Sequence, residues 1–346
     1  MQRMYLEAKL MQKSLAVKYR PTKFDDVVEQ KATRQILVNQ LENSTFKQAY
    51  LFVGPAGCGK TTTARIFANE VNGGSGVTIE IDAASHGNVN DIREIGVQAK
   101  LKPVDSLYKV FIIDECHCLS AAGWSAMLKL IEEPPATAIF IFCTTDVQKV
   151  PKTIMSRCQR FDFTRISLAS ITARLKYICE QEHFKNVNDD ALEYIAKLSD
   201  GGMRDAITLL DKSLAYNTSF TIEDVITALG TVDYDVMFNL TDWILKNEKV
   251  EVFNVIENEY RKGKDLKLFV KNYIQFLLDT SKLYIGCAWE YTQFPKRSDY
   301  VQFIDSISED DFNILLRLLD KLVILQSDIK YSSSPKYDIE ATLLLI

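Results

Sequence analysis

The sequence lacks any apolar run near the ~20 residues that a membrane-spanning helix needs. It also lacks the pattern of a secretory signal peptide, because Arg3, Glu7 and Lys9 interrupt its start, where a continuous apolar segment would stand. We therefore expect a soluble, cytoplasmic protein that has no membrane partner.

Basic residues are too few for the surface to bind nucleic acid nonspecifically. The 346 residues include 41 Lys and Arg against 46 Asp and Glu, a net charge of −5, so any contact with DNA has to be local. Disorder is also excluded, since 47% of the residues are hydrophobic. A folded chain of this length exceeds what one core usually supports, which favours roughly two or three domains.

Cysteine and histidine are too scattered for disulfide or metal chemistry. The seven cysteines are an odd number, and Cys58, Cys143 and Cys158 lie in or beside apolar segments, as reduced thiols do. Residues 116–118, Cys-His-Cys, look like a metal cluster, but residues that alternate along an extended segment point to opposite faces, and no second cysteine pair is near. We expect no metal there. No activated Ser or Cys accompanies any of the three histidines, which are His86, His117 and His183.

Apolar runs alternate with helical stretches through the first two-thirds of the chain, which is the pattern of a parallel sheet covered by helices on both sides. The expected strands are 50–53, 78–82, 110–114, 139–143 and 161–163. From about Ser167 helical periodicity takes over, first in a three-helix module at 171–181, 189–199 and 204–214. After residues 230–233 we expect a second helical region, with helices at 236–247, 250–262, 266–284, 309–327 and 339–346.

Residues 54–61, Gly-Pro-Ala-Gly-Cys-Gly-Lys-Thr, match the phosphate-loop pattern G-x-x-x-x-G-K-[ST]. The match directly follows an apolar strand and directly precedes the helical run 62–70, which is the context that the motif requires. Its glycines let backbone N–H groups converge on phosphate oxygens, while Lys60 reaches the β- and γ-phosphates and Thr61 ligates magnesium. The alternative, a glycine-rich turn that happens to contain Lys and Thr, does not account for this register.

A second apolar strand ends in two acids, Asp114 and Glu115, the arrangement called Walker B. Ligands bind at the strand tips of such sheets. We expect Asp114 to hold the magnesium ion through its water shell and Glu115 to polarise the attacking water as a general base. An acid pair at a strand end is usually just solvated, but together with the phosphate loop it indicates a nucleotide-hydrolysing site.

Further motifs stand in the order seen in the AAA+ clamp-loader ATPases. They are Tyr19-Arg20-Pro21, 24–28, 80–85, 91–93, 128–135, 144–146, the Ser-Arg-Cys motif at 156–158 and 201–206. Over about residues 14–230, and more weakly to the C-terminus, the sequence most resembles the gamma/tau subunits of bacterial DNA polymerase III. The resemblance implies an α/β fold: an AAA+ P-loop domain with a parallel five-stranded sheet, a three-helix lid and an all-helical collar that drives oligomerisation. The implied parts are an N-terminal extension at 1–13, the ATP-binding domain at 14–164, the lid at 165–230 and the collar at 231–346.

The resemblance also implies roles for single residues. Thr145 matches sensor 1, which feels the γ-phosphate, and Arg204 matches sensor 2, which reaches down from the lid. Arg157 matches the arginine of the Ser-Arg-Cys motif, which acts on the nucleotide of the neighbouring subunit. The alternative for either arginine is a surface salt bridge. The implied nucleotide-binding residues are Tyr19, Arg20 and Val28 on the adenine side, with Gly54, Pro55, Ala56, Gly57, Cys58, Gly59, Lys60, Thr61 and Thr62.

For DNA, the family lines a central chamber with helix N-termini and a few basic side chains that face the phosphates. Arg93, Lys100 and Lys102, on the stretch after Asn88, are the candidates in this sequence. The alternative for these residues is an ordinary solvated helix face.

The sequence departs from the cellular members of the family in several places. Cellular gamma/tau proteins carry a four-cysteine zinc module between the phosphate-loop helix and the next strand. In this sequence residues 71–77 stand at that place and contain no cysteine, so no zinc is expected. The chain also stops where the collar stops and begins with a short extension. A viral or mobile-element form of the clamp loader fits these departures. An engineered deletion joined by Gly-Gly-Ser-Gly is the alternative.

These features predict an ATP-hydrolysing motor subunit of a DNA polymerase sliding-clamp loader. It would use ATP and Mg²⁺ and assemble with other clamp-loader subunits, as a pentamer by resemblance, with the sliding clamp and primer-template DNA. A non-hydrolysing stator is one alternative, but it has no chemical need for the intact set of Lys60, Thr61, Asp114 and Glu115. Another AAA+ DNA motor, such as a Holliday-junction translocase, is a second, but it would lack the Ser-Arg-Cys motif and would end in a winged-helix domain.

Overall fold

The structure is a computed structural model that describes residues 14–76, 78–104, 106–184, 187–229, 234–293 and 298–345. Two compact units divide the chain: the described parts of Met1–Phe184 and Ser199–Asp211 form the first, and those of Lys185–Leu198 and Lys212–Ile346 form the second. The boundary falls inside helix α10 (Met203–Tyr216). The region expected to be a lid, residues 165–230, is therefore divided between the two compact units. The domain boundaries at 165 and 231 stay predictions.

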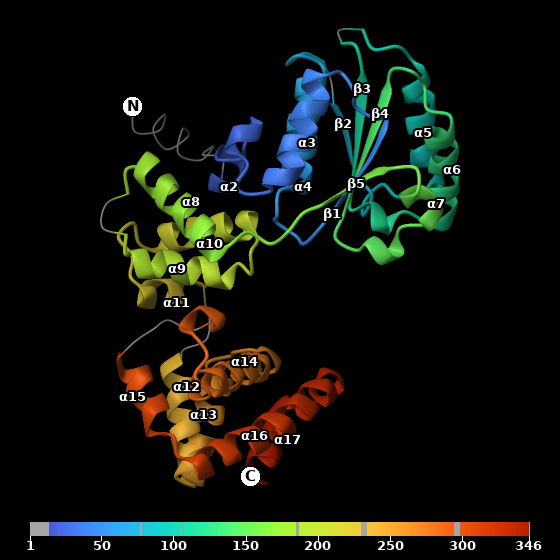
Figure 1. The fold of residues 1–346 in the computed structure, drawn as a ribbon. Helices are drawn as coiled ribbons and strands as arrows, with labels where there is room; N and C mark the ends of the chain where they lie inside the picture. The colour runs from blue at the N-terminus through green and yellow to red at the C-terminus, as the bar shows by residue number, and fades with distance from the viewer. Residues whose placement is uncertain are drawn as a thin grey trace, which may run out of the picture. The chain divides into compact units, whose positions relative to one another are not determined.

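A parallel five-stranded sheet organises the first unit, as predicted (Figure 1). The strands run in the order β2-β3-β4-β1-β5. They are β1 (Ala49–Val53), β2 (Thr78–Asp82), β3 (Lys109–Asp114), β4 (Ala138–Thr144) and β5 (Gln159–Asp162). β5 begins two residues earlier than expected, because polar Gln159 and Arg160 are tolerated on an edge strand, which pairs with β1 alone.

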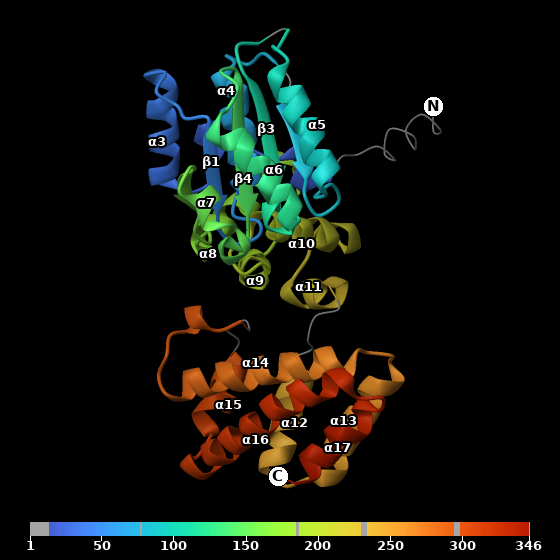
Figure 2. The same cartoon turned by 90° about the vertical axis from the view of Figure 1, so that its right-hand side faces the viewer.

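Helices cover both faces of this sheet (Figures 1 and 2). Side chains alternate along each strand, so Phe52 packs with α3 (Lys31–Glu42) and α4 (Lys60–Val71). Its neighbour Leu51 packs on the other face with α5 (Val89–Lys100) and α6 (Ala121–Glu132). Burial of both faces explains why β1 and β4 are continuous apolar runs. The remaining elements of this unit are α2 (Leu15–Lys18), η1 (Phe24–Asp26), η2 (Cys116–Cys118), η3 (Val147–Lys149), α7 (Lys152–Met155) and α8 (Leu168–Gln181).

The prediction that residues 116–118 are extended is wrong, because they form the 3-10 helix η2. Glu115 takes a left-handed conformation directly after β3 and turns the chain out of the sheet. The turn is closed by the backbone N–H of Cys118, which donates to the carbonyl of Glu115 at 2.9 Å. Within the described ranges, no group of three or more His, Cys, Asp or Glu side chains is placed to hold a metal ion.

The second unit is helical throughout its described part, and two of its helices were not expected. These are α11 (Ile222–Leu229) and α15 (Ser298–Ser306), short helices whose burial depends on distant partners; Tyr300 of α15, for instance, stacks on Phe238 with ring centroids 3.9 Å apart. The predicted junction at 230–233 lies outside the described residues. The other elements are α9 (Asp189–Leu198), α12 (Tyr234–Leu245), α13 (Lys249–Arg261), α14 (Leu266–Tyr284), η4 (Trp289–Tyr291), α16 (Glu309–Asp328), η5 (Ile329–Tyr331) and α17 (Pro335–Leu344).

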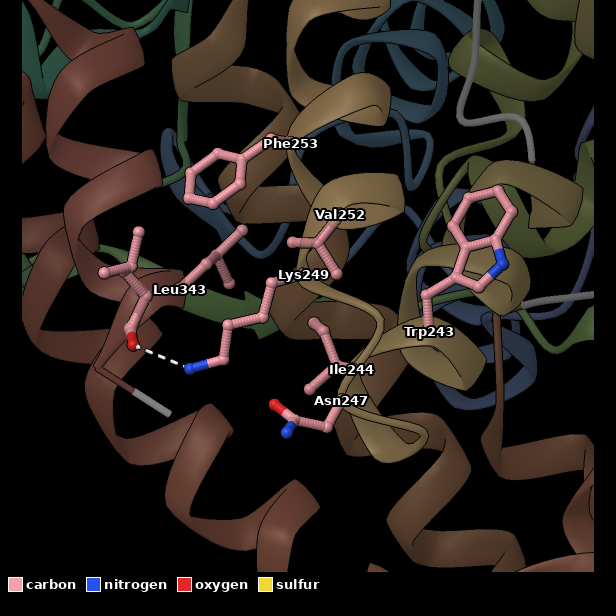
Figure 3. Close-up of a pocket in the computed structure, with 8 residues that line it drawn as sticks. Trp243, Ile244, Asn247, Lys249, Val252, Phe253 and Leu343 are labelled. Atoms are coloured by element: carbon pink, nitrogen blue, oxygen red, sulfur yellow. Dashed lines mark hydrogen bonds between the residues drawn. The ribbon is translucent and has the colours of Figure 1, made fainter.

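A small pocket between α12, α13 and α17 shows how the last helix is held (Figure 3). Lys249 donates from Nζ to the backbone carbonyl of Leu344 at 3.5 Å, at the C-terminal end of α17. The cavity has a volume of about 20 Å³, and a single water molecule already needs roughly 10–15 Å³. It is therefore a gap in packing and too small for an organic ligand.

No described helix is both long enough and apolar enough to cross a membrane.

Asp279 is a fully buried carboxylate that ties α14 to the segment after η4. It accepts hydrogen bonds from Gln275 Nε2 at 3.0 Å, from Lys282 Nζ at 2.8 Å and from the backbone N–H of Gln293 at 2.7 Å. Burying a carboxylate is costly unless donors surround it. These three donors satisfy it and fix the path of the chain that leaves α14.

Asp279→Ala should therefore lower the free energy of unfolding of the second unit by about 3 kcal/mol, because it leaves buried donors without an acceptor. Urea unfolding of the full chain, followed by amide hydrogen exchange across α14, measures the change. Lys246→Ala, which removes an exposed pair with Asp242, is the control and should leave that exchange unchanged. Equal effects of the two variants would contradict the role given to Asp279.

Candidate active site

A cavity of about 490 Å³ lies in the first unit, where the carboxyl ends of the strands meet. Its walls come from the phosphate loop, the end of β3, the segment around α2 and the start of α10. Most of the residues expected to bind nucleotide line it: Tyr19, Arg20, Val28, Ala56, Gly57, Cys58, Gly59, Lys60, Thr61 and Thr62. Gly54 and Pro55 lie behind the lining, at the base of the loop.

The phosphate loop holds its own lysine. Lys60 is only 6% exposed, and its Nζ donates to the carbonyls of Gly54 at 2.8 Å and Pro55 at 2.7 Å. These neutral acceptors keep the buried ammonium satisfied. Phosphate oxygens form stronger, charge-assisted bonds with an ammonium, so the lysine can exchange these carbonyls for a bound phosphate.

Gly57 lets the loop touch the turn before α10. Its φ of +71° lies in the left-handed region, and a Cβ added there would stand 2.8 Å from Gly202 Cα. At this contact the backbone N–H of Met203 donates to the carbonyl of Gly57 at 3.0 Å. The phosphate loop and the N-terminus of α10 are thus joined backbone to backbone, which no larger residue at position 57 permits.

Thr61 and Asp114 meet at the tip of β3. The Thr61 hydroxyl donates to Asp114 Oδ2 at 2.7 Å, and Asp114 Oδ1 accepts from the backbone N–H of Glu115 at 3.0 Å. A hydroxyl and a carboxylate at the edge of an anion-binding loop are the oxygen ligands that Mg²⁺ prefers alongside phosphates. The pair therefore fits a magnesium ion held together with a nucleotide.

Glu115 and Thr145 come from neighbouring strands, β3 and β4. The Thr145 hydroxyl donates to Glu115 Oε2 at 3.2 Å. Glu115 lines the cavity directly, whereas Thr145 reaches it through this bond. The two residues matched to the general base and to sensor 1 are thus brought together, because β4 lies between β1 and β3 in the sheet.

Guanidinium groups line the cavity from several elements, together with acidic side chains: the arginines are Arg20, Arg65, Arg174 and Arg204, and the acids are Glu80, Asp82, Asp114, Glu115 and Asp205. Burial and the nearby charges of Arg65 and Arg204 lower the pKa of Arg20. Arg65 donates from Nε and one terminal nitrogen to both carboxylate oxygens of Glu80, each at 2.6 Å, and this pairing raises the pKa of Arg65. Arg65 and Glu80 were not among the predicted site residues. The only signal for Arg65 in the sequence is its place one helical turn after Thr61.

The wall of the cavity that we expect to face adenine is anchored to α8. The Tyr19 hydroxyl donates to Glu182, which also pairs with Lys18 at 2.6 Å. Burial, followed by this bond to the carboxylate, raises the pKa of Tyr19 to about 12. Arg174 donates to the Tyr19 carbonyl at 3.2 Å. Sequence reasoning missed Arg174 and Glu182, because no local pattern links positions that are 155 and 163 residues from Tyr19.

Arg157 lies at the opposite edge of the sheet from the phosphate loop. It precedes β5, whose first residue, Gln159, pairs with Tyr50 near the start of β1, whereas the loop follows the end of β1. Its guanidinium bonds Glu132 at 2.8 Å and the carbonyl of Thr153 at 2.9 Å. The phosphate loop therefore lies at the carboxyl end of β1, and Arg157 lies near its amino end. The structure does not bring Arg157 to the cavity of its own chain.

Two of the DNA candidates lie on α5 and one just after it. Arg93 and Lys100 are exposed and seven residues apart, so they share one face of the helix, and Lys102 follows the helix end. The N-terminus of α5 is capped by Asn88 and Asp91 in a capping box. Asp91 places a carboxylate at that terminus, so the basic side chains, rather than the helix end, are the part of α5 suited to phosphates.

Two family models match the chain. The model of the DNA polymerase III delta subunit matches residues 75–167, and that of the ATPase lid domain of DNA polymerase III clamp-loader subunits matches residues 170–219. The DNA polymerase III gamma subunit of Buchnera aphidicola is 31% identical, and the alignment covers 96% of this chain and 98% of that protein. The chain belongs to the DNA polymerase III gamma/tau family.

Other members of the gamma/tau family extend further than this match. The tau subunit of Bacillus subtilis is 38% identical over 75% of this chain but only 50% of its own length, and a Mycobacterium tuberculosis gamma/tau subunit is 35% identical over 76% and 50%. The chain thus spans about half the length of these relatives.

Among solved structures, the Thermotoga maritima RuvB Holliday junction branch migration motor matches with a TM-score of 0.51 and 20% identity, covering 66% of this chain and 80% of that one. This likeness shows the fold, which is AAA+.

Gly57→Ala should separate the phosphate loop of this gamma/tau protein from α10, because a left-handed alanine costs about 1–2 kcal/mol before the contact with Gly202 is counted. We expect faster hydrogen exchange at the Met203 amide and nucleotide affinity reduced about tenfold or more. Gly73→Ala is the matched control, since Gly73 also has a positive φ but a Cβ there meets nothing. If both variants bind nucleotide equally well, the contact has no role in binding.

Proposed function

We propose that this chain is the ATP-hydrolysing motor subunit of a DNA polymerase sliding-clamp loader. One observation carries the proposal: in a gamma/tau chain, Lys60, Thr61, Asp114 and Glu115 converge on one cavity large enough for a nucleotide. A stator without turnover is the alternative, but it has no chemical need for the complete set. The cytoplasm is the compartment that fits this work.

Binding of ATP rests on the phosphate loop and the arginines. Lys60 exchanges the carbonyls of Gly54 and Pro55 for phosphate oxygens, and Thr61 and Asp114 hold Mg²⁺, which neutralises charge on the phosphates. Tyr19, Arg20 and Val28 form the adenine side. We further propose that the chain needs no zinc, which its cysteine-free segment at 71–76 supports.

Hydrolysis rests on residues at the γ-phosphate. Glu115 accepts the proton of the attacking water, Thr145 reads the γ-phosphate, and Arg204 contributes a positive charge from α10. Arg157 acts on the nucleotide of the next subunit, because its place at the far edge of the sheet leaves it no access to its own. Assembly would then complete each site.

Assembly with companion subunits is assigned to the helical region after about residue 233. Large apolar side chains are exposed there, among them Val250, Ile285, Val323, Ile324 and Leu345, which suit an interface better than water. Other clamp-loader subunits, in a pentamer, would cover them. The sliding clamp and primer-template DNA are the further partners, with Arg93, Lys100 and Lys102 as the proposed DNA contacts.

Lys60→Ala should abolish nucleotide binding, whereas Glu115→Gln should bind ATP normally and lose turnover. The lysine neutralises phosphate charge in the ground state, while the glutamate acts only on the attacking water. Equilibrium binding and steady-state hydrolysis, measured for both variants, separate the two effects. Equal losses of ATP affinity would mean that the roles are misassigned.

Arg157→Ala subunits mixed with Lys60→Ala subunits should recover DNA-stimulated ATPase activity that neither variant has alone. A functional site needs Lys60 from one chain and Arg157 from its neighbour, and arginines supplied in trans are worth about 10³ to 10⁵ in rate. Native mass measurement confirms that the two variants assemble together. If the mixed assemblies stay inactive, Arg157 has no role in catalysis and serves only in its salt bridge with Glu132.

A further inference from the structure

His117 lies outside the set of predicted site residues, yet its side chain contacts the carboxylate of Glu115. It lies on η2, with its side chain 15% exposed. Its Nδ1 stands 3.3 Å from Glu115 Oε2 and 3.1 Å from the Thr144 hydroxyl. The contact joins the end of β3 to the end of β4.

Two neighbours of Glu115 meet at the same oxygen. Oε2 accepts a hydrogen bond from the Thr145 hydroxyl and stands within ion-pair distance of His117 Nδ1, 3.3 Å away. Glu115 Oε1, by contrast, makes no hydrogen bond or ion pair with any residue that the structure describes. A carboxylate held by one oxygen presents the other in a fixed direction, and a general base needs its accepting oxygen aimed at the water.

We propose that His117 is a positioning residue, which holds the carboxylate of Glu115 so that Oε1 accepts the proton of the attacking water. The inference rests on the proposed ATPase function and deepens it. Glu115 needs such a restraint because its side chain is 39% exposed, and the Thr145 hydroxyl is its only other side-chain partner among the described residues.

The charge of Glu115 selects the tautomer of His117. With hydrogen on Nδ1, the ring donates to the Thr144 hydroxyl and places the positive end of its N–H group near Glu115 Oε2. With hydrogen on Nε2, a lone pair of Nδ1 would face the carboxylate and repel it. Neutral His117 therefore carries its proton on Nδ1.

The ring is itself held by two anchors. The Thr144 hydroxyl that it contacts also accepts from the backbone N–H of Asp146 at 3.0 Å, which fixes the end of β4. The neighbouring Cys116 is fully buried, and its carbonyl accepts from the backbone N–H of Leu119 at 3.0 Å, which fixes η2. His117 thus transmits the position of the sheet to the carboxylate.

His117→Ala and His117→Asn, made in the full assembled chain, test the inference. The alanine variant should lower kcat for ATP about tenfold or more, as misplacement of a catalytic group does, with KM and nucleotide affinity unchanged within about twofold. The asparagine variant should recover most of the loss, since its amide nitrogen occupies the place of Nδ1. His183→Asn is the matched control and should keep full activity, because His183 is exposed in a left-handed conformation that asparagine tolerates.

Two results would overturn the inference. One is a wild-type kcat in His117→Ala. The other is a loss of kcat in His117→Asn as large as in the alanine variant, which would mean that His117 contributes only packing. The proposed function fails separately, if the wild-type chain hydrolyses no ATP or if Glu115→Gln hydrolyses it at the wild-type rate.

Discussion

The register of β4 between β1 and β3 is the constraint on which the site depends. Val53 pairs with Thr144, and Ile113 pairs with Phe142, so the phosphate loop, the acid pair and Thr145 all leave the sheet at one edge. The loop is fastened there, because the backbone N–H of Gly54 donates to the carbonyl of Thr144 at 3.2 Å. A slip of one residue would turn every side chain of β4 to the other face, and the close packing of these side chains in the two buried layers opposes it.

The same sheet separates Arg157 from the cavity of its own chain. A parallel strand has its carboxyl end at one edge and its amino end at the other, about 13 Å away for β1. The phosphate loop uses the first edge, and Arg157 lies at the second. An arginine placed so does not reach the cavity of its own chain, and for this reason we propose that it acts on a neighbouring subunit.

The structure also separates binding from turnover. Lys60, Thr61 and Asp114 bond one another or the loop, and in the proposed function phosphate and magnesium replace these partners. The side chain of Glu115 instead accepts a hydrogen bond from Thr145 and lies 3.3 Å from His117 Nδ1, at the end of β4. A fault in the first set would weaken binding, whereas a fault in the second would leave binding intact and misdirect the water.

The sequence by itself determined the sheet, the phosphate loop and the acid pair, because these are local patterns: continuous apolar strands, a glycine-rich loop of fixed spacing, and acids at a strand end. It also carried the family resemblance, and with it the fold class. It did not determine η2, whose turn depends on the left-handed Glu115, nor α15, which is held by stacking on distant Phe238. Tertiary structure alone decided that Glu182 and Arg174 anchor Tyr19, that Met203 bonds Gly57, and that His117 reaches Thr144. The physical reason is that these contacts join side chains and turns through the folded sheet and α8, and no local spacing records which of them will meet.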